Sequence, residues 1–277
     1  MHISVATATF YFLPFEETLE IIAEAGFQNI ELDLFWEWKQ WTMAQHLRDV
    51  PVSQVIRLVQ RSGLKVISIH DGGGVLTDRN STKGYINPRL DEYLGQLGYA
   101  PEYLVFHPPQ VEGDLDAGWW KGISGEIVQT LDPYRSACSY LTIENEPFFE
   151  GFFVPLTTPE ELRTFVTQNG LGVTVDTTHY AHMGINIREA ARILNGNIRS
   201  VHLSDYVDGR AHVFVGEGQL DLEGFLRLAD PTVLNTVTLE CSVSTADRSD
   251  RQMSHPEMVS RLRILKAKVE NFLIKKI

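Results

Sequence analysis

The chain has 277 residues, of which 43% are hydrophobic and 22% are charged. This composition is typical of a folded globular protein and excludes an intrinsically disordered one. Asp and Glu outnumber Lys and Arg by 36 to 24, so the formal net charge is −12, which disfavours nucleic acid and anionic membranes as partners.

Apolar, β-branched segments alternate with amphipathic segments along the whole chain. In chain order, strands are expected at His2–Thr7, Asn29–Leu34, Leu64–His70, Tyr103–His107, Tyr140–Glu144, Leu171–Asp176, Ile198–Ser204 and Val237–Cys241. Helices with one apolar face are expected at Phe15–Ala25, Val52–Arg61, Thr158–Gln168, Ile187–Leu194 and His255–Ile274. For Gly113–Tyr134 we expect a long loop followed by a short helix.

This alternation predicts a single α/β domain, a (β/α)₈ TIM barrel over residues 1–277. An open doubly wound sheet is the structural alternative, but it would need a glycine-rich phosphate turn after the first strand. The sequence there reads ATATFYF, which contains no glycine. No linker or shift in composition divides the chain.

Two cysteines, Cys138 and Cys241, are too few for a disulfide framework, and neither lies in a CxxC motif. The start of the sequence has no basic segment before its apolar residues, so no signal peptide is expected. No run of about 18 apolar residues suggests a transmembrane helix. We therefore expect a cytoplasmic protein with reduced thiols and no membrane partner.

Carboxylate or imidazole residues stand at or near the carboxyl ends of seven predicted strands: Glu31, His70, His107, Glu144, Asp176, His202 and Glu240. In a TIM barrel this end carries the reactive groups. Each residue alone could be a hydrogen-bonded polar group at a strand end. Together they predict a shared cation, because desolvating several carboxylates side by side is costly without one.

Four of these residues, Glu144, Asp176, His202 and Glu240, form an oxygen-rich set with one imidazole. Such a set suits one Mn²⁺, Co²⁺, Mg²⁺ or Zn²⁺ ion and leaves positions open for substrate oxygens. His179 follows Asp176 by three residues in DTTH, so we expect it to face the same pocket.

The motifs TIENEP, VDTTH, SVHLSDY, HVFVGEGQLD and LECS, in this order, resemble those of the xylose-isomerase-like TIM barrels. That superfamily includes ketose 3-epimerases, sugar isomerases, inosose dehydratase and, more distantly, the endonuclease IV branch. The resemblance covers essentially the whole chain but does not select one member.

The resemblance implies a single-metal site at Glu144, Asp176, His202 and Glu240. It also implies that His179 and Arg210 contact substrate. Glu150 falls where epimerases place a further glutamate. His70 and His107 would be substrate-binding groups or the ligands of a second metal.

The function implied is a metal-dependent isomerase or epimerase acting on a sugar, keto-polyol or sugar phosphate. Glu144 and Glu240 would transfer protons as acid and base, through an enediolate that the metal stabilises. The substrate class is a small molecule, and a homo-oligomer is compatible with the sequence.

Three alternatives stay open: an endonuclease IV-type phosphodiester hydrolase, an inosose dehydratase-like lyase and a retaining glycosidase using Asn145-Glu146-Pro147. The endonuclease branch has Asp-x-His after the seventh strand, where this chain reads Arg210-Ala211-His212. Because a guanidinium cannot ligate zinc, we expect His179 and His212 alone to be too few for a third metal.

Overall fold

Eight strands form the central barrel. They are β1 (His2–Ala6), β2 (Asn29–Asp33), β3 (Lys65–His70), β5 (Tyr103–Phe106), β7 (Tyr140–Glu144), β9 (Gly172–Asp176), β10 (Ile198–Leu203) and β13 (Thr236–Leu239). In this computed structural model they close in the order β1-β13-β10-β9-β7-β5-β3-β2. Neighbouring strands pair in parallel, for example Val201 of β10 with Val175 of β9. The predicted TIM barrel is confirmed.

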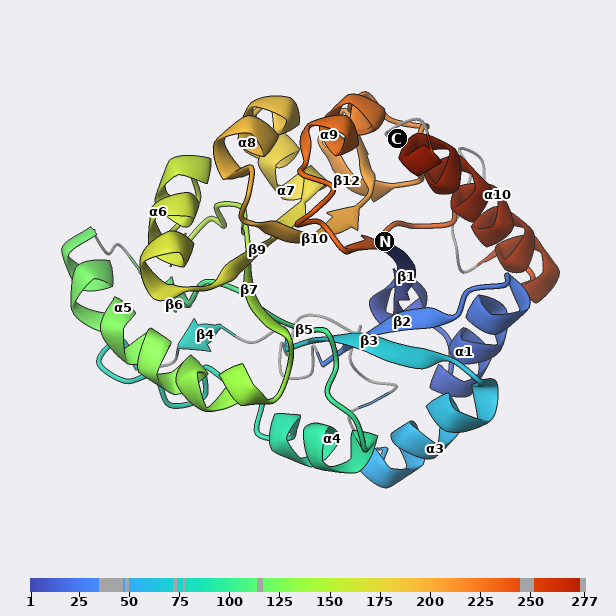
Figure 1. Cartoon of the computed structure of the whole chain (residues 1–277), viewed down its shortest axis with the longest axis horizontal. Helices are drawn as coiled ribbons and strands as arrows, with labels where there is room; N and C mark the ends of the chain where they lie inside the picture. Colours follow the sequence, from blue (N-terminus) through green and yellow to red (C-terminus); the bar gives the residue numbers. More distant parts are fainter. Residues whose placement is uncertain are drawn as a thin grey trace.

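Helices surround the strands (Figure 1). They are α1 (Phe15–Glu24), α3 (Val52–Ser62), α4 (Leu90–Leu97), α5 (Ala117–Leu131), α6 (Pro159–Asn169), α7 (Thr177–His182), α8 (Ile187–Leu194), α9 (Leu222–Leu228) and α10 (His255–Ile274), with 3₁₀ turns η1 (Thr7–Phe10) and η3 (Asp132–Ser136). The structure describes residues 1–34, 47, 50–71, 74–76, 78–113, 117–244 and 252–274. In this part of the chain no helix is both long and apolar enough to cross a membrane.

Local sequence explains where α6 begins and ends. The Thr158 hydroxyl accepts a hydrogen bond from the Glu161 amide, and the Glu161 carboxylate accepts one from the Thr158 amide, which completes a capping box. Gly170 ends the helix at a φ of 61°, a left-handed conformation that glycine adopts without a steric cost. By contrast, the loop expected before a short helix at Gly113–Tyr134 is wrong, since α5 occupies most of it.

The barrel interior contains a layer of small hydroxyl side chains. Ser4, Ser68, Thr142, Thr174, Ser200 and Thr238 are each at most 1% exposed. Five of them bond one another across strands: the Thr174 hydroxyl lies 2.7 Å from that of Thr142 and 2.6 Å from that of Ser200, and the hydroxyls of Ser4 and Thr238 lie 2.8 Å apart. Branched apolar residues dominate most barrel interiors, so this layer is unusually polar.

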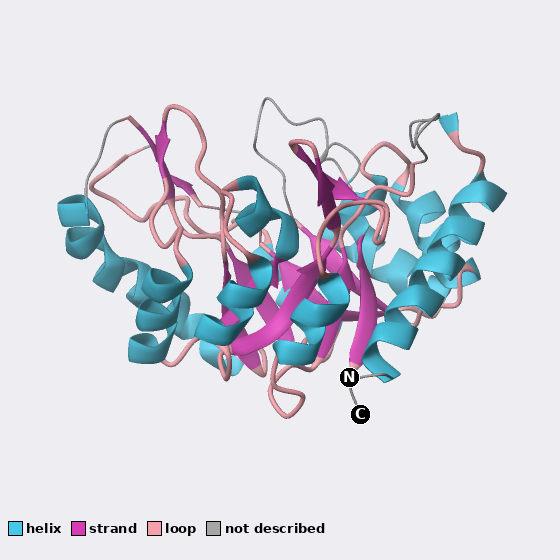
Figure 2. Ribbon diagram, turned by 90° about the horizontal axis from the view of Figure 1, so that it is seen from above, coloured by secondary structure: helices cyan, strands magenta, loops and turns pink. Residues whose placement is uncertain are grey.

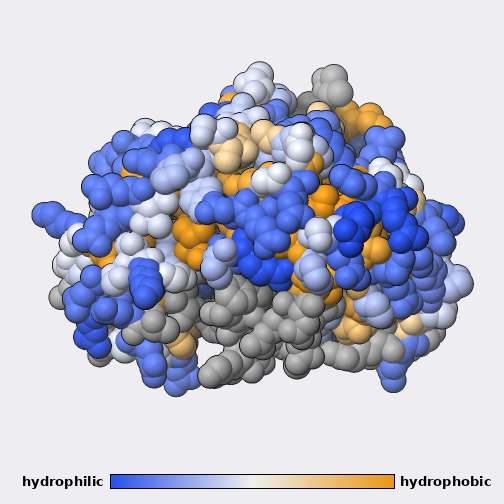
Figure 3. All heavy atoms as spheres, turned by 90° about the horizontal axis from the view of Figure 1, so that it is seen from below, coloured by the Kyte–Doolittle hydropathy of each residue, from blue (hydrophilic) through white to orange (hydrophobic). Residues whose placement is uncertain are grey.

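Short strands extend beyond the carboxyl end of the barrel. One small sheet contains β4 (Val75–Leu76), β6 (Gln110–Glu112) and β8 (Phe152–Phe153), and a hairpin contains β11 (Asp205–Val207) and β12 (Arg210–Val213). Figure 2 shows these strands at the end opposite the N-terminus. The face in Figure 3 is mainly hydrophilic where it is coloured, with apolar side chains scattered between polar ones.

Candidate metal centre

Glu144, Asp176, His202 and Glu240 converge at the carboxyl end of the barrel. β7 and β9 end at Glu144 and Asp176, His202 lies one residue before the end of β10, and Glu240 follows β13 directly. One ligand-type atom from each residue lies within 4.8 Å of those from the other three. The sequence predicted this set, and the fold brings its members together.

The chemistry of these atoms fits a cation. Glu144 Oε2, Asp176 Oδ2, His202 Nδ1 and Glu240 Oε2 are buried, and none makes a hydrogen bond within the described chain. His202 Nδ1 lies 2.8 Å from Glu240 Oε2 and 3.2 Å from Glu144 Oε2. Buried polar atoms that make no hydrogen bond are costly, and a divalent cation would satisfy all four at once. Three carboxylates and one imidazole suit Mn²⁺, Mg²⁺, Co²⁺ or Zn²⁺.

Glu31 orients His202 from behind. Its Oε1 lies 2.9 Å from His202 Nε2, and its Oε2 accepts a 2.7 Å hydrogen bond from the Ser68 hydroxyl. This contact is an ion pair, and a carboxylate beside Nε2 favours a proton on that nitrogen, so that Nδ1 could bind a metal. Glu31 was noted in the sequence as a strand-end acid, but its role behind His202 was not predicted.

The two carboxylate oxygens of Asp176 have different surroundings: one caps a helix and the other faces the candidate metal centre. Oδ1 accepts from the amides of Thr178 at 2.7 Å and His179 at 2.8 Å, which caps α7. Oδ2 is left facing the cluster. The Asn145 side chain bonds both the amide and the carbonyl of Asp176, at 2.8 and 3.0 Å, and so fixes β9 against the end of β7.

His70 and His107 form a second group beside Glu144. Their Nε2 atoms lie 2.7 Å apart, and both are within 3.4 Å of Glu144 Oε2. The opposite ring nitrogens face carboxylates: His107 Nδ1 lies 2.7 Å from Glu146 Oε1, and His70 Nδ1 lies 3.4 Å from Asp33 Oδ1. Glu146 was considered only as part of the Asn145-Glu146-Pro147 alternative, and its contact with His107 was not predicted.

The charges of the cluster are strongly interdependent. Burial alone would lower the pKa of His202, but the carboxylates of Glu144, Glu31 and Glu240 raise it well above its usual range. Burial would likewise raise the pKa of Glu144, but His202 and His70 hold it well below its usual range. The chain therefore needs positive charge here, and protonated histidines supply it when no cation does.

His179 and His212 lie on the other side of Asp176. His179 Nδ1 lies 2.8 Å from the Asn145 carbonyl and 3.4 Å from Glu144 Oε1. His212 Nδ1 lies 4.0 Å from Asp176 Oδ2, and the two rings meet edge to face at 5.6 Å. The expectation that these two histidines alone are too few for a third metal stays a prediction, and Asp176 lies close enough to form a group of three potential ligands with them.

Two predicted substrate residues lie outside the described contacts of the cluster. Arg210 begins β12, where it pairs with Val207, and its side chain is exposed. Glu150 is exposed in the turn that precedes β8. Neither makes a described contact with the four-residue set, so their contact with substrate stays a prediction.

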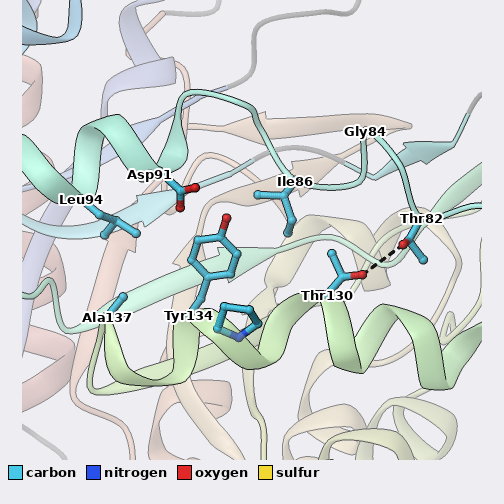
Figure 4. A pocket seen from close by; sticks show the side chains of 9 residues that line it. Thr82, Gly84, Ile86, Asp91, Leu94, Thr130, Tyr134 and Ala137 are labelled. Carbon is cyan, nitrogen blue, oxygen red and sulfur yellow. Dashed lines mark hydrogen bonds between the residues drawn. The ribbon is translucent and has the colours of Figure 1, made fainter.

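A cavity of about 550 Å³ lies apart from the strand-end cluster, beside α4 and η3 (Figure 4). In Figure 4 the Tyr134 ring and the Asp91 carboxylate point toward the same space. None of the predicted site residues lines this cavity. We assign the chemistry to the strand ends because ligand-type atoms converge there.

Comparison with known proteins shows the family of the chain. A family described as xylose isomerase-like TIM barrel matches residues 19–263. No curated protein sequence matches the chain.

Several solved structures share the fold. A D-tagatose 3-epimerase-like protein is 20% identical, with a TM-score of 0.68 and 100% of both chains covered. An IolI protein with a bound zinc atom is 20% identical, with a TM-score of 0.72 and 97% and 98% of the two chains covered. A D-psicose 3-epimerase from Clostridium cellulolyticum H10, solved with D-tagatose, is 14% identical, with a TM-score of 0.68 and 99% of each chain covered.

Proposed function

Because the chain belongs to the xylose isomerase-like TIM barrel family, we propose that it is a cation-dependent isomerase or epimerase of a small sugar or keto-polyol. The observation that carries the proposal is the convergence of four buried ligand-type atoms without hydrogen bonds, on Glu144, Asp176, His202 and Glu240. Neighbours described as ketose 3-epimerases support the substrate class. The buried thiols of Cys138 and Cys241, which are not joined in a disulfide, are compatible with the cytoplasm.

A divalent cation held by these four residues would polarise a substrate carbonyl and acidify the neighbouring C–H bond. Glu144 and Glu240 then serve as the base that removes the proton and the acid that returns one. They stand three strands apart in the closed barrel order, β13-β10-β9-β7, so they approach a bound substrate from different sides. His179 and Arg210 are proposed to bind the substrate hydroxyls.

A second cation between His70 and His107 is part of the proposal. Without a proton or a cation between them, the two Nε2 lone pairs would face each other at 2.7 Å, beside Glu144 Oε2. Two lone pairs and a carboxylate oxygen repel one another unless a positive centre lies among them. Either a proton or a second metal ion supplies this positive charge. The number of metal ions bound per chain at saturating Mn²⁺ distinguishes the two cases.

Solvent labelling tests the reaction. The Mn²⁺-loaded protein is incubated in D₂O with D-fructose, D-tagatose, D-psicose and L-ribulose, and deuterium at the carbon next to the carbonyl is followed by NMR. Glu144→Gln should lower the exchange rate at least 100-fold, while the exposed control Glu20→Gln leaves it unchanged. Turnover without solvent deuterium, or an active Glu144→Gln variant, contradicts the assignment of Glu144.

A phosphodiester hydrolase is the second candidate, because three groups of ligand-type residues lie together here, at His70/His107/Glu144, Glu144/Asp176/His202/Glu240 and Asp176/His179/His212. The net charge of −12 opposes a DNA substrate. Nicking of an abasic duplex by the Zn²⁺-loaded protein, with three zinc ions per chain, would replace the sugar proposal with this one.

A further inference from the structure

His212 adopts a backbone conformation that its residue type rarely takes. Its φ is +53°, in the left-handed region, within the short strand β12. This region is costly for most residues that carry a Cβ atom, and it persists where the surrounding structure enforces it. Strain of this kind is concentrated at functional sites, which makes the contacts of His212 informative.

Those contacts join β12 to the segment that carries Glu240. The His212 carbonyl accepts a 2.8 Å hydrogen bond from the Ser242 amide. The ring nitrogen Nδ1 lies 3.0 Å from the Glu240 carbonyl oxygen. In a parallel β-ladder, a residue uses its own carbonyl and its own amide to hydrogen-bond two residues of the neighbouring strand. These two residues lie on either side of the one it is paired with. Here the His212 imidazole, in place of the His212 amide, bonds the Glu240 carbonyl.

The chemistry of the contact fixes the tautomer of His212. A carbonyl oxygen can only accept, so Nδ1 must carry the proton that points to Glu240. The Ser204 hydroxyl, 3.3 Å from Nδ1, shares the same hydrogen or turns its own proton elsewhere. Nε2 is then left as an acceptor.

The segment behind His212 is itself held firmly. Asp205 accepts hydrogen bonds from the amides of Tyr206, Gly216, Gly218 and Leu220, at 2.9 to 3.1 Å. A Cβ atom at Gly218 would lie 2.3 Å from Asp205 Oδ1, so only glycine fits there. One buried carboxylate thus fixes the base of the β11–β12 hairpin, from which His212 reaches Glu240.

We propose that His212 is a positioning residue, which sets the backbone of Glu240 through its Nδ1–H and so directs the Glu240 carboxylate toward Asp176 and His202. The strained φ is the conformation that brings the ring, in place of the amide, to the Glu240 carbonyl. The proposal depends on the proposed function only in the expectation that Glu240 binds a cation and transfers a proton.

The first test observes the tautomer in the metal-free wild-type chain. Long-range ¹H–¹⁵N NMR spectra of the histidine rings, with His212 assigned by comparison with His212→Gly, should show protonated Nδ1 and unprotonated Nε2. A neutral ring with its proton on Nε2 overturns the proposal. This readout requires neither a metal nor a substrate.

The second test uses substitutions that tolerate the same backbone. His212→Gly keeps access to positive φ and removes the donor, and Asp208→Gly is the matched control because Asp208 has a φ of +49° in the same hairpin. His212→Gly should weaken Mn²⁺ binding, measured by calorimetry, by 10- to 100-fold, while Asp208→Gly binds as the wild type does. Should His212→Gly fail to fold, His212→Asn replaces it, since asparagine also tolerates this region.

A folded His212 variant with wild-type Mn²⁺ affinity overturns the positioning role. With a ketose that the wild type converts, His212→Gly should lower kcat more than it raises KM. A wild-type protein that binds Mn²⁺ but converts no ketose would contradict the proposed function alone, since the tautomer and the metal affinity would still report on His212.

Discussion

Glu31 on β2 and His202 on β10 lie three strands apart around the barrel, yet Glu31 Oε1 is 2.9 Å from His202 Nε2. Both side chains are fully buried. The other nitrogen of the same ring faces Glu144 and Glu240. The His202 imidazole thus connects Glu31 to the candidate metal ligands Glu144 and Glu240. The geometry of the candidate metal centre therefore depends on the Glu31 carboxylate, which is not one of its ligands.

Removing the Glu31 carboxylate should therefore weaken metal binding without removing a ligand. We expect Glu31→Gln to bind Mn²⁺ 10- to 100-fold more weakly than the wild type, because the negative charge that holds the His202 proton is lost. Calorimetric titration of dialysed protein measures this. The exposed control Glu20→Gln should match the wild type, and equal affinity of all three proteins would contradict the role of Glu31.

Metal binding should also stabilise the fold. A ligand at 100 times its Kd adds about 2.7 kcal/mol to the free energy of unfolding, which for a chain of this size raises Tm by about 5 °C. We expect this rise on adding Mn²⁺ to metal-free protein, measured by calorimetry. In Glu240→Ala the rise should disappear at the same Mn²⁺ concentration; an equal rise in that variant would place the cation elsewhere.

Glycine residues of this chain should respond to substitution in opposite directions. Gly218→Ala places a Cβ atom 2.3 Å from Asp205 Oδ1 and 2.7 Å from the Tyr206 carbonyl, so we expect a loss of about 2 kcal/mol. Gly125→Ala, on the exposed side of α5 with nothing within 4 Å of the new atom, should add about 1 kcal/mol. Urea unfolding midpoints compare the two, and a stable Gly218→Ala protein would show that the Asp205 contacts are dispensable.

Two tyrosines of the folded chain should ionise at a higher pH than they do in the unfolded chain. Burial, with Asp91 beside it, raises the pKa of Tyr134 to about 12, and burial raises that of Tyr103 to about 12. The unfolded chain releases these protons near pH 10, so the stabilisation is complete below pH 10 and is lost as the pH rises toward 12.

Absorbance at 295 nm should show late tyrosine ionisation that loses one component in Tyr134→Phe and another in Tyr103→Phe. The fall in unfolding free energy between pH 10 and 12 should be shallower in both variants. Complete ionisation by pH 11 in the folded wild type would contradict the shifts.

The barrel and its ligand set were predictable because strand ends in this fold face one point. Alternation along each strand then carries Glu144 and Asp176 to the same side as Thr142 and Thr174. The sequence contains a further signal for the inward-facing residues: Ser or Thr stands two residues before His70, Glu144, Asp176, His202 and Glu240. This repeated spacing marks the inward face of five strands.

Other features depend on contacts that no spacing in the sequence encodes. Trp119 and Trp120 suggested a loop, but residues 117–131 form α5, in which Trp120 packs against Phe165. This packing outweighs the low helix propensity of the α5 glycines. The pairing of Glu146 with His107 joins two different loops, and Glu31 meets His202 across the barrel. Only the closed sheet brings these residues together.

The hydrogen bonds that hold the β11–β12 hairpin to Asp205 have a consequence for how this protein can change. The amides of Tyr206 and Leu220 both bond the Asp205 carboxylate, so the chain between these two residues begins and ends at the same side chain. The hairpin tip, residues 207–211, lies outside these contacts and is largely exposed, so it can vary while Glu144, Asp176 and His202 keep their places on the strands. Libraries confined to residues 207–211, which leave out His212 and the glycines that bond Asp205, should therefore change ligand binding far more often than they prevent folding.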